Sequence, residues 1–298
     1  MNVVTTQRLS LRYGRRVGIE AVDLLVPEGE IFGFLGPNGA GKTTTIRVLL
    51  GMLRPSGGSA TIFGRDCWRQ SHRIKRQLGY LPGDLRLYPW LTAENALRIS
   101  GQVRGRDVAS FGLALAERFR LDRTLSVRRM SRGMRQKLGI VLALAHQPKL
   151  LVLDEPTAGL DPLMRDELAC CLRELAARQH TVFFSSHSLS EVEQLCNRVA
   201  VVRAGRVVAS DTIDALRRQA RRSVTLRFRD AATAGRVTPP GFLTMLERRG
   251  PLWTCDLVGG TPELVRWAAT QPIDDVAIGP PSLDSLFRRF YRTQEESP

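Results

Sequence analysis

The segment that decides the fold reads Gly36-Pro37-Asn38-Gly39-Ala40-Gly41-Lys42-Thr43, and Thr44 follows it. It matches the pattern of two spaced glycines, a lysine and a hydroxyl residue that cradles nucleotide phosphates. The glycines let the backbone curl so that its N–H groups point inward at phosphate oxygens. This segment therefore predicts a nucleotide-binding loop.

The residues on either side of the loop support this interpretation. The apolar run 30–35 predicts a short buried strand before it, and residues 44–50 predict a helix after it. The N-terminus of that helix would add partial positive charge beside an anion. In this setting we expect Lys42 to reach the β- and γ-phosphates and Thr43 to offer its hydroxyl to Mg²⁺.

Composition limits the classes of protein that fit. The chain has 298 residues and a formal net charge of +15. No apolar run approaches the roughly 20 residues that a membrane span needs, and the first thirty residues lack the pattern of a signal peptide. The five cysteines form no C-x-x-C pair, which indicates reduced thiols.

The basic charge has more than one interpretation. It can indicate nucleic acid or an anionic membrane surface, and an arginine-rich codon bias would produce the same number. The basic residues are scattered, without a run of six and without interleaved aromatic residues that would stack bases. We therefore favour proximity to a membrane over nucleic-acid binding.

The hydrophobic pattern predicts an α/β fold in two parts. Strand and helix patterns alternate from 150 to 203, which is typical of a parallel sheet. A mostly helical block, at about 84–146, interrupts the alternation. We place one domain at 1–221 and expect a small α+β domain at 222–298, including a helix at 283–291.

Polar residues that could carry chemistry follow two of the expected strands. The run 150–153 ends in Asp154 and Glu155, and the run 181–184 is followed by Ser185-Ser186-His187. Asp154 is expected to hold Mg²⁺, usually through water, and Glu155 to act as general base on the attacking water. His187 would contact the γ-phosphate and orient water and base, since α/β sheets build their sites at this edge.

One further segment points to a family. Met130-Ser131-Arg132-Gly133-Met134 precedes an apolar helix, with Ser131 as a natural N-cap. The order of Tyr13, the phosphate loop, Ser131-x-Gly133, residues 150–155, Gly159-Leu160-Asp161 and His187 resembles that of the ATP-binding-cassette (ABC) ATPases. The resemblance covers residues 3 to about 215.

The resemblance implies a P-loop NTPase fold with an inserted helical subdomain, and a full set of nucleotide contacts. Tyr13 would stack on adenine, residues 36–44 would wrap the phosphates, and Asp161 would belong to the nucleotide site. The helix that starts at Ser131, with Gly133, would bind the γ-phosphate of an opposite subunit. Two copies would thus clasp two ATP molecules head to tail, with ATP and Mg²⁺ as the cofactors.

The whole chain, including the ending 281–287, looks like the stand-alone ATPase subunits of bacterial drug and antibiotic exporters. That likeness implies a separately encoded integral-membrane permease as the partner, and a drug, an antibiotic or a lipid-like molecule as the cargo. It also implies a cytoplasmic position, peripheral on the inner face of the cell membrane, with no nucleic-acid partner.

Two departures from the family pattern stand out. Where the family usually has Gln after residues 79–82, this chain has Gly83, and we hypothesise that Asp84 partly substitutes for it. The family signature Leu-Ser-Gly-Gly-Gln is here Met130 to Met134, so Ser131 and Gly133 are kept while Arg132 adds a charge and Met134 removes an amide. We expect the clasping of ATP to survive these changes.

Two other classes of function stay open at this point. One is a soluble cassette ATPase that acts on ribosomes or nucleic acid, although such ribosome factors usually carry two cassettes and this chain has one phosphate loop. The other is a regulatory module whose C-terminal domain binds a ligand. A neighbouring gene for a permease would favour the exporter, and co-purification with ribosomes would favour the first alternative.

Overall fold

The computed structural model describes residues 1–281 and 283. The chain divides into two compact units, Met1–Asp211 and a second that begins at Thr212. The domain border expected at 221/222 falls ten residues beyond this division (221 − 211). Nearly all of the predicted helix 283–291, and most of the ending 281–287, lie outside the described residues.

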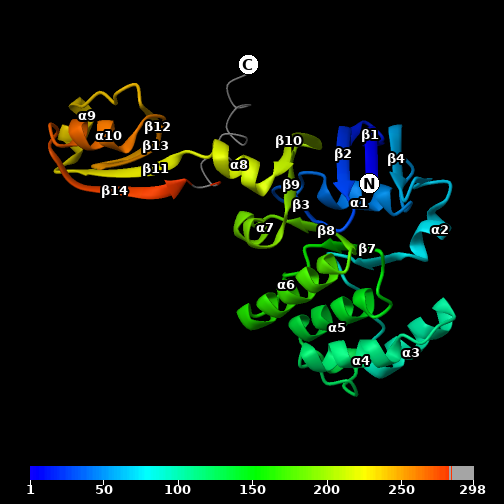
Figure 1. The fold of residues 1–298 in the computed structure, drawn as a ribbon. Coiled ribbons are helices and arrows are strands. Elements are labelled where there is room, and N and C mark those ends of the chain that lie inside the picture. Colours follow the sequence, from blue (N-terminus) through cyan, green and yellow to red (C-terminus); the bar gives the residue numbers. More distant parts are fainter. Residues whose placement is uncertain (282, 284–298) are drawn as a thin grey trace. The chain divides into compact units, whose positions relative to one another are not determined.

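A six-stranded sheet forms the centre of the first unit (Figure 1). Its order is β10-β9-β3-β8-β7-β6, and the pairs from β9 to β6 are parallel. The strands are β3 (Ile31–Leu35), β6 (Leu78–Leu81), β7 (Leu150–Asp154), β8 (Thr181–Ser186), β9 (Arg198–Arg203) and β10 (Arg206–Thr212). Every residue of β3, β7 and β8 is buried, as expected for parallel strands covered on both faces.

A second sheet has the order β2-β1-β4-β5, and its strand pairs are antiparallel. Its strands are β1 (Asn2–Tyr13), β2 (Arg16–Pro27), β4 (Gly57–Ile62) and β5 (Arg65–Asp66). Helix α1 (Lys42–Leu49) packs against strands of both sheets, so the helix that follows the phosphate loop lies between them (Figure 1). Its position is fixed by a continuous apolar core that includes Ile46, Val48 and Phe183.

Seven further helical segments complete the first unit. They are α2 (Ser71–Lys75), α3 (Ala93–Arg104), α4 (Ala109–Arg118), the 3₁₀ segment Val127–Arg129, α5 (Arg132–Leu144), α6 (Pro162–Ala177) and α7 (Leu189–Leu195). Helices α3, α4 and α5 contact one another and fall within the predicted helical block. Helices α6 and α7 pack on β3 and β8 of the parallel sheet.

An ion-pair cluster ties the helical block to α6. Arg118 on α4 donates two hydrogen bonds of 2.7 Å to the two carboxylate oxygens of Glu174 and one to Glu167. The bidentate geometry suits a guanidinium and a carboxylate. Hydrogen bonding to Arg118 lowers the pKa of Glu174 to about 2. The position of α4 on α6 is therefore set by charge as well as by packing.

The second unit is built on a four-stranded antiparallel sheet with the order β12-β13-β11-β14. Its elements are α8 (Ile213–Gln219), β11 (Arg222–Phe228), α9 (Ala231–Arg236), β12 (Leu243–Arg249), β13 (Leu252–Leu257), α10 (Thr261–Ala268) and β14 (Ile273–Pro281). Trp253 is fully buried in its core beside Phe228, with ring centroids 4.6 Å apart. The predicted α+β character is present in the described residues.

No helix in the described part of the chain combines the length and the apolar character that crossing a bilayer takes.

A buried histidine makes the stability of the first unit depend on pH. His146 is 2% exposed, with Nε2 at 3.0 Å from the Leu78 carbonyl oxygen. Burial, together with repulsion from Arg104 and Arg106, lowers the pKa of His146 from 6.5 to about 4. The unfolded chain therefore takes up a proton below about pH 6.5, whereas the folded chain does so only near pH 4.

We expect the free energy of unfolding to fall by roughly 3 kcal/mol between pH 6.5 and pH 4 because of this residue, and to change no further below that. Urea unfolding at several pH values measures the slope. The substitution His146→Asn should flatten it, while the exposed His72→Gln should not. Equal slopes in all three proteins would contradict this account of His146.

Candidate active site

The phosphate loop joins β3 to α1 and is held by its own lysine. Lys42 is 5% exposed, and its Nζ donates to the carbonyl oxygens of Gly36 (2.7 Å) and Pro37 (3.1 Å). Gly36 has to be glycine, because a Cβ there would lie 2.3 Å from the carbonyl oxygen of Val202. The ammonium group is thus fixed inside the curl of the loop, where a phosphate would lie.

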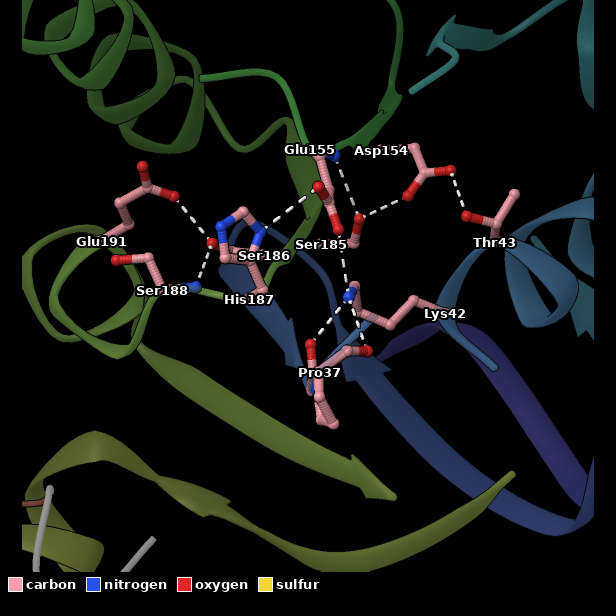
Figure 2. Close-up of polar contacts among 11 residues, drawn as sticks. Pro37, Lys42, Thr43, Asp154, Glu155, Ser185, Ser186, His187, Ser188 and Glu191 are labelled. Carbon is pink, nitrogen blue, oxygen red and sulfur yellow. Dashed lines mark hydrogen bonds and ion pairs between the residues drawn. The ribbon is translucent and has the colours of Figure 1, made fainter. Parts of the chain in front are cut away.

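Two oxygen ligands of the kind that Mg²⁺ prefers meet beside the loop. The Thr43 hydroxyl donates to Oδ2 of Asp154 over 2.9 Å, and the Ser185 hydroxyl donates to Oδ1 over 2.6 Å (Figure 2). Asp154 is 1% exposed. A hydroxyl and a carboxylate at the mouth of a phosphate loop fit a small, hard cation. Thr43 and Asp154 could therefore hold Mg²⁺.

Glu155 lies between two basic side chains. Its Oε1 is 3.0 Å from Lys42 Nζ, and its Oε2 is 3.3 Å from Nδ1 of His187 (Figure 2). Its backbone has a φ of 51°, in the left-handed region that non-glycine residues rarely occupy. Strain of this kind gathers at functional sites, and here it turns the carboxylate at the end of β7 toward the phosphate loop.

A small hydrogen-bond network holds the segment that carries His187. The Ser186 hydroxyl donates to Glu191 over 2.7 Å and accepts from the Ser188 N–H over 2.9 Å. The Ser185 hydroxyl also accepts the N–H of Glu155 over 3.1 Å. Ser185 of strand β8 therefore hydrogen-bonds both the backbone N–H of Glu155, the general-base candidate, and the side chain of Asp154. The sequence indicates these serines only as neighbours of His187.

The pKa of the half-buried Tyr80 is shifted by its surroundings, including a charged residue of the site. Burial, and then the negative charge of Asp154, raise the pKa of Tyr80 to about 12. The phenol therefore stays neutral at physiological pH beside the proposed metal ligand.

A cavity of about 350 Å³ opens next to the phosphate loop. Its lining comprises Tyr13, Arg16, Val17, Gly18, Asn38, Gly39, Gly41, Lys42, Thr43, Thr44 and Glu155. Tyr13 is 46% exposed, and its hydroxyl lies 3.5 Å from Oγ1 of Thr44. Arg16, which the sequence did not indicate, faces Tyr13 across the β1–β2 hairpin and adds a cation to this cavity.

The signature segment at the start of α5 lies against a different loop. Ser131 caps α5 by accepting the Met134 N–H over 3.2 Å. A Cβ on Gly133 would lie 2.7 Å from the Gly159 carbonyl oxygen, and the buried Gln136 donates to the Pro156 carbonyl oxygen over 2.9 Å. The loop 155–161 therefore joins the base candidate Glu155 to the start of α5.

Asp161 caps a helix in this structure. Its Oδ1 accepts the Met164 N–H over 3.0 Å at the start of α6. None of Ser131, Gly133 and Asp161 is among the described residues that line the cavity beside the phosphate loop. The structure brings together Tyr13, the phosphate loop, Asp154, Glu155 and His187, and it places the signature segment elsewhere.

The substitution Gly133→Ala tests the packing of α5 on this loop. The added methyl group would meet a backbone oxygen that cannot move without shifting Gly159, so the start of α5 should move away. We expect the rate of ATP hydrolysis to fall at least about tenfold with little change in ATP affinity, since the effect acts on the geometry of the loop 155–161, which carries Glu155. Steady-state phosphate release and nucleotide titration separate the two quantities, and Gly235→Ala, with open space around its Cβ position, serves as control. A Gly133→Ala rate equal to that of the control would contradict this role.

The structure also shows where the residues that depart from the family pattern lie. A Cβ on Gly83 would lie 3.5 Å from Oδ2 of Asp154, so this position adjoins the proposed metal ligand. Asp84 is instead paired with Arg86 over 2.9 Å, and its side chain is 74% exposed. The structure thus gives no support to the hypothesis that Asp84 substitutes for the missing Gln. The side chain of Arg132 lies over Gly159, where a Cβ would be 3.5 Å from its Cγ.

The chain is similar to several known proteins. The family model described as "ABC transporter" matches residues 19–158. The bacitracin transport ATP-binding protein BcrA of Bacillus licheniformis is 36% identical over 231 residues, which cover 76% of each chain. The daunorubicin resistance ATP-binding protein DrrA3 of Streptomyces coeruleorubidus is 34% identical over 298 residues, covering 95% of this chain and 94% of that protein.

A solved structure described as the ATP binding subunit of an ABC transporter is 33% identical, with a TM-score of 0.69, and covers 73% of this chain and 92% of its own. The predicted α/β phosphate-loop fold is confirmed by this likeness.

Proposed function

The chain belongs to the ABC transporter family, and we propose that residues 36–44, Asp154, Glu155 and His187 form its half of an ATP-hydrolysing site. It is an ATPase that powers an exporter together with a separately encoded membrane permease. The observation that carries the residue assignment is the position of Glu155, bound to Lys42 on one side and to His187 on the other.

Hydrolysis forms a bond between a water oxygen and the γ-phosphorus while the bond to the bridging oxygen of ADP breaks. In our proposal Glu155 accepts the proton of the attacking water, and His187 orients that carboxylate and contacts the γ-phosphate. Lys42 and the N–H groups of the phosphate loop hold the β- and γ-phosphates. Mg²⁺, held by Thr43 and Asp154, would neutralise charge that develops on the phosphate oxygens.

We propose Tyr13 as the platform for adenine. Its exposed ring lines the same cavity as the phosphate loop. Tyr13 is the last residue of β1, next to the turn that joins β1 to β2. An aromatic ring beside a phosphate site offers stacking to a base without choosing among bases.

A second copy of the chain completes the site in this proposal. The cavity beside the phosphate loop opens outward, and Ser131 and Gly133 contribute nothing to it in one copy. At the start of α5 Ser131 caps only the Met134 N–H, and the other N–H groups of the first turn, which have no carbonyl partner within the helix, suit a phosphate. A head-to-tail pair would place that helix of one copy on the nucleotide of the other, as the family resemblance implies, and Asp161 would lie near the same junction.

The cargo and location are inferred from relatives. Because the two relatives above are named for bacitracin transport and daunorubicin resistance, we propose that this chain drives efflux of a drug or an antibiotic. It would act in the cytoplasm, at the inner face of the cell membrane, bound to its permease.

Co-expression of the chain with the permease of a neighbouring gene, followed by purification and screening of ATPase activity against candidate drugs, tests this proposal. The expected result is stable co-purification and hydrolysis that the exported compound stimulates. A chain that co-purifies with ribosomes instead, and that no membrane partner binds, would contradict it.

A further inference from the structure

We propose that a basic groove on the first unit binds the phosphate headgroups of anionic phospholipids, an inference that rests on the proposed function at the membrane. The groove has a volume of about 820 Å³ and lies between α2 and the C-terminal end of α3. Its lining residues are His72, Lys75, Arg76, Ser100, Gln102, Val103, Arg104, Gly105 and Arg106.

Positive charge converges on this groove from two separate segments. Lys75 and Arg76 come from the end of α2, while Arg104 and Arg106 flank the C-cap Gly105 of α3. Among the described residues that line the groove, none is Asp or Glu. Burial, and then repulsion from Arg106, lower the pKa of Arg104, so the cations are already crowded. A bound anion would relieve that repulsion.

Several arginines of the first unit outside the groove have carboxylate partners. Arg118 is bound to Glu174, Arg206 to Glu20 over 2.8 Å, and Arg123 to Glu94 over 3.1 Å. Within the described part of the chain, no ion pair is found for the four cations of the groove. Its charge therefore faces outward and is available to a partner of opposite charge.

The chemistry around the cations favours a lipid headgroup over other anions. No Phe, Tyr or Trp is among the described lining residues, so bases of a single-stranded nucleic acid would lack the large aromatic rings on which they usually stack. Val103 is 82% exposed in the same lining and offers an apolar contact beside the charges. Basic side chains next to an exposed apolar one suit the boundary of an anionic membrane.

Vesicle sedimentation with the full-length chain tests this proposal. Vesicles of phosphatidylcholine alone are compared with vesicles that also contain phosphatidylglycerol, at one fixed ionic strength. Two groove variants, Lys75→Gln/Arg76→Gln and Arg104→Gln/Arg106→Gln, are compared with Arg227→Gln/Arg229→Gln, which removes the same charge from the second unit. Thermal melting and ATP hydrolysis are measured on every preparation.

We expect binding that needs phosphatidylglycerol, weakened on the order of tenfold by either groove pair and less than about threefold by the control pair. Equal weakening by all three pairs, with ATP hydrolysis intact, would overturn the groove and leave the proposed function standing. Binding of poly-glutamate is measured on the same proteins. Groove variants that lose binding to poly-glutamate but keep vesicle binding would also overturn the proposal, and would assign the groove to an acidic protein segment. Failure of the wild-type chain to hydrolyse ATP would instead count against the proposed function.

Discussion

The substitution Glu155→Gln is expected to lower the rate of ATP hydrolysis by about 10²- to 10⁴-fold, the range that a general base contributes. The amide keeps the shape of the side chain and its contact with Lys42, which lies 3.0 Å from Oε1 in the wild-type chain. It cannot accept the proton of the attacking water. ATP binding should therefore persist while hydrolysis stops, and a dimer trapped by ATP should accumulate.

Steady-state phosphate release measures the rate, and sedimentation with and without ATP measures the dimer. The control is Glu117→Gln, an exposed glutamate of α4 that takes no part in the site. A Glu155→Gln protein that retains more than about a tenth of the wild-type rate would remove Glu155 from the role of general base.

The substitution Lys42→Ala is expected to weaken ATP binding by about 100-fold, which corresponds to roughly 3 kcal/mol. Lys42 is a nearly fully buried cation with three oxygen partners: two loop carbonyls and the Glu155 carboxylate. Phosphate oxygens would compete with Glu155 for this ammonium group, and Glu155 would then be released toward the water. Loss of Lys42 removes the attraction for phosphate and leaves Glu155 paired only with His187.

Nucleotide titration measures the affinity directly. The rise in melting temperature with ATP offers a second readout, because a ligand stabilises the fold only where it binds. The matched control is Lys149→Ala, an exposed lysine that immediately precedes β7. An unchanged affinity in Lys42→Ala would mean that the loop does not hold the phosphates as we propose.

Much of the parallel sheet could be predicted from sequence because its signals are local. The apolar runs at 31–35, 150–153 and 181–184 are all buried strands, and each is followed by residues of the site. Parallel strands carry their polar residues at one common edge. The meeting of the phosphate loop with Asp154, Glu155 and His187 therefore follows once β3, β8 and β7 lie side by side in one parallel sheet.

The contacts between distant residues could not be predicted in the same way. Nothing local indicates that Ser185 bonds Asp154, or that Gln136 of α5 bonds the Pro156 carbonyl oxygen. Such pairs depend on how separate elements are packed. Arg16 was missed for a similar reason, since it lies in the cavity only because the β1–β2 hairpin places it opposite Tyr13.

Strand β14 shows a different limit. Most of its residues are exposed and it ends in two prolines, so it lacks the alternation that marks a half-buried strand. It lies at the edge of its sheet, beside β11, where proline is tolerated because one side of the strand needs no partner. Helices α8 and α9 were missed because each is a short segment of six or seven residues.

The central claim is that two copies of the chain complete each hydrolytic site, and the dependence of specific ATPase activity on protein concentration tests it most directly. Sedimentation in parallel gives the monomer fraction at each concentration. We predict that turnover per chain falls in step with the loss of dimer, because Ser131 and Gly133 of a second copy are then missing. Undiminished turnover per chain in a sample that sediments wholly as monomer would contradict the account.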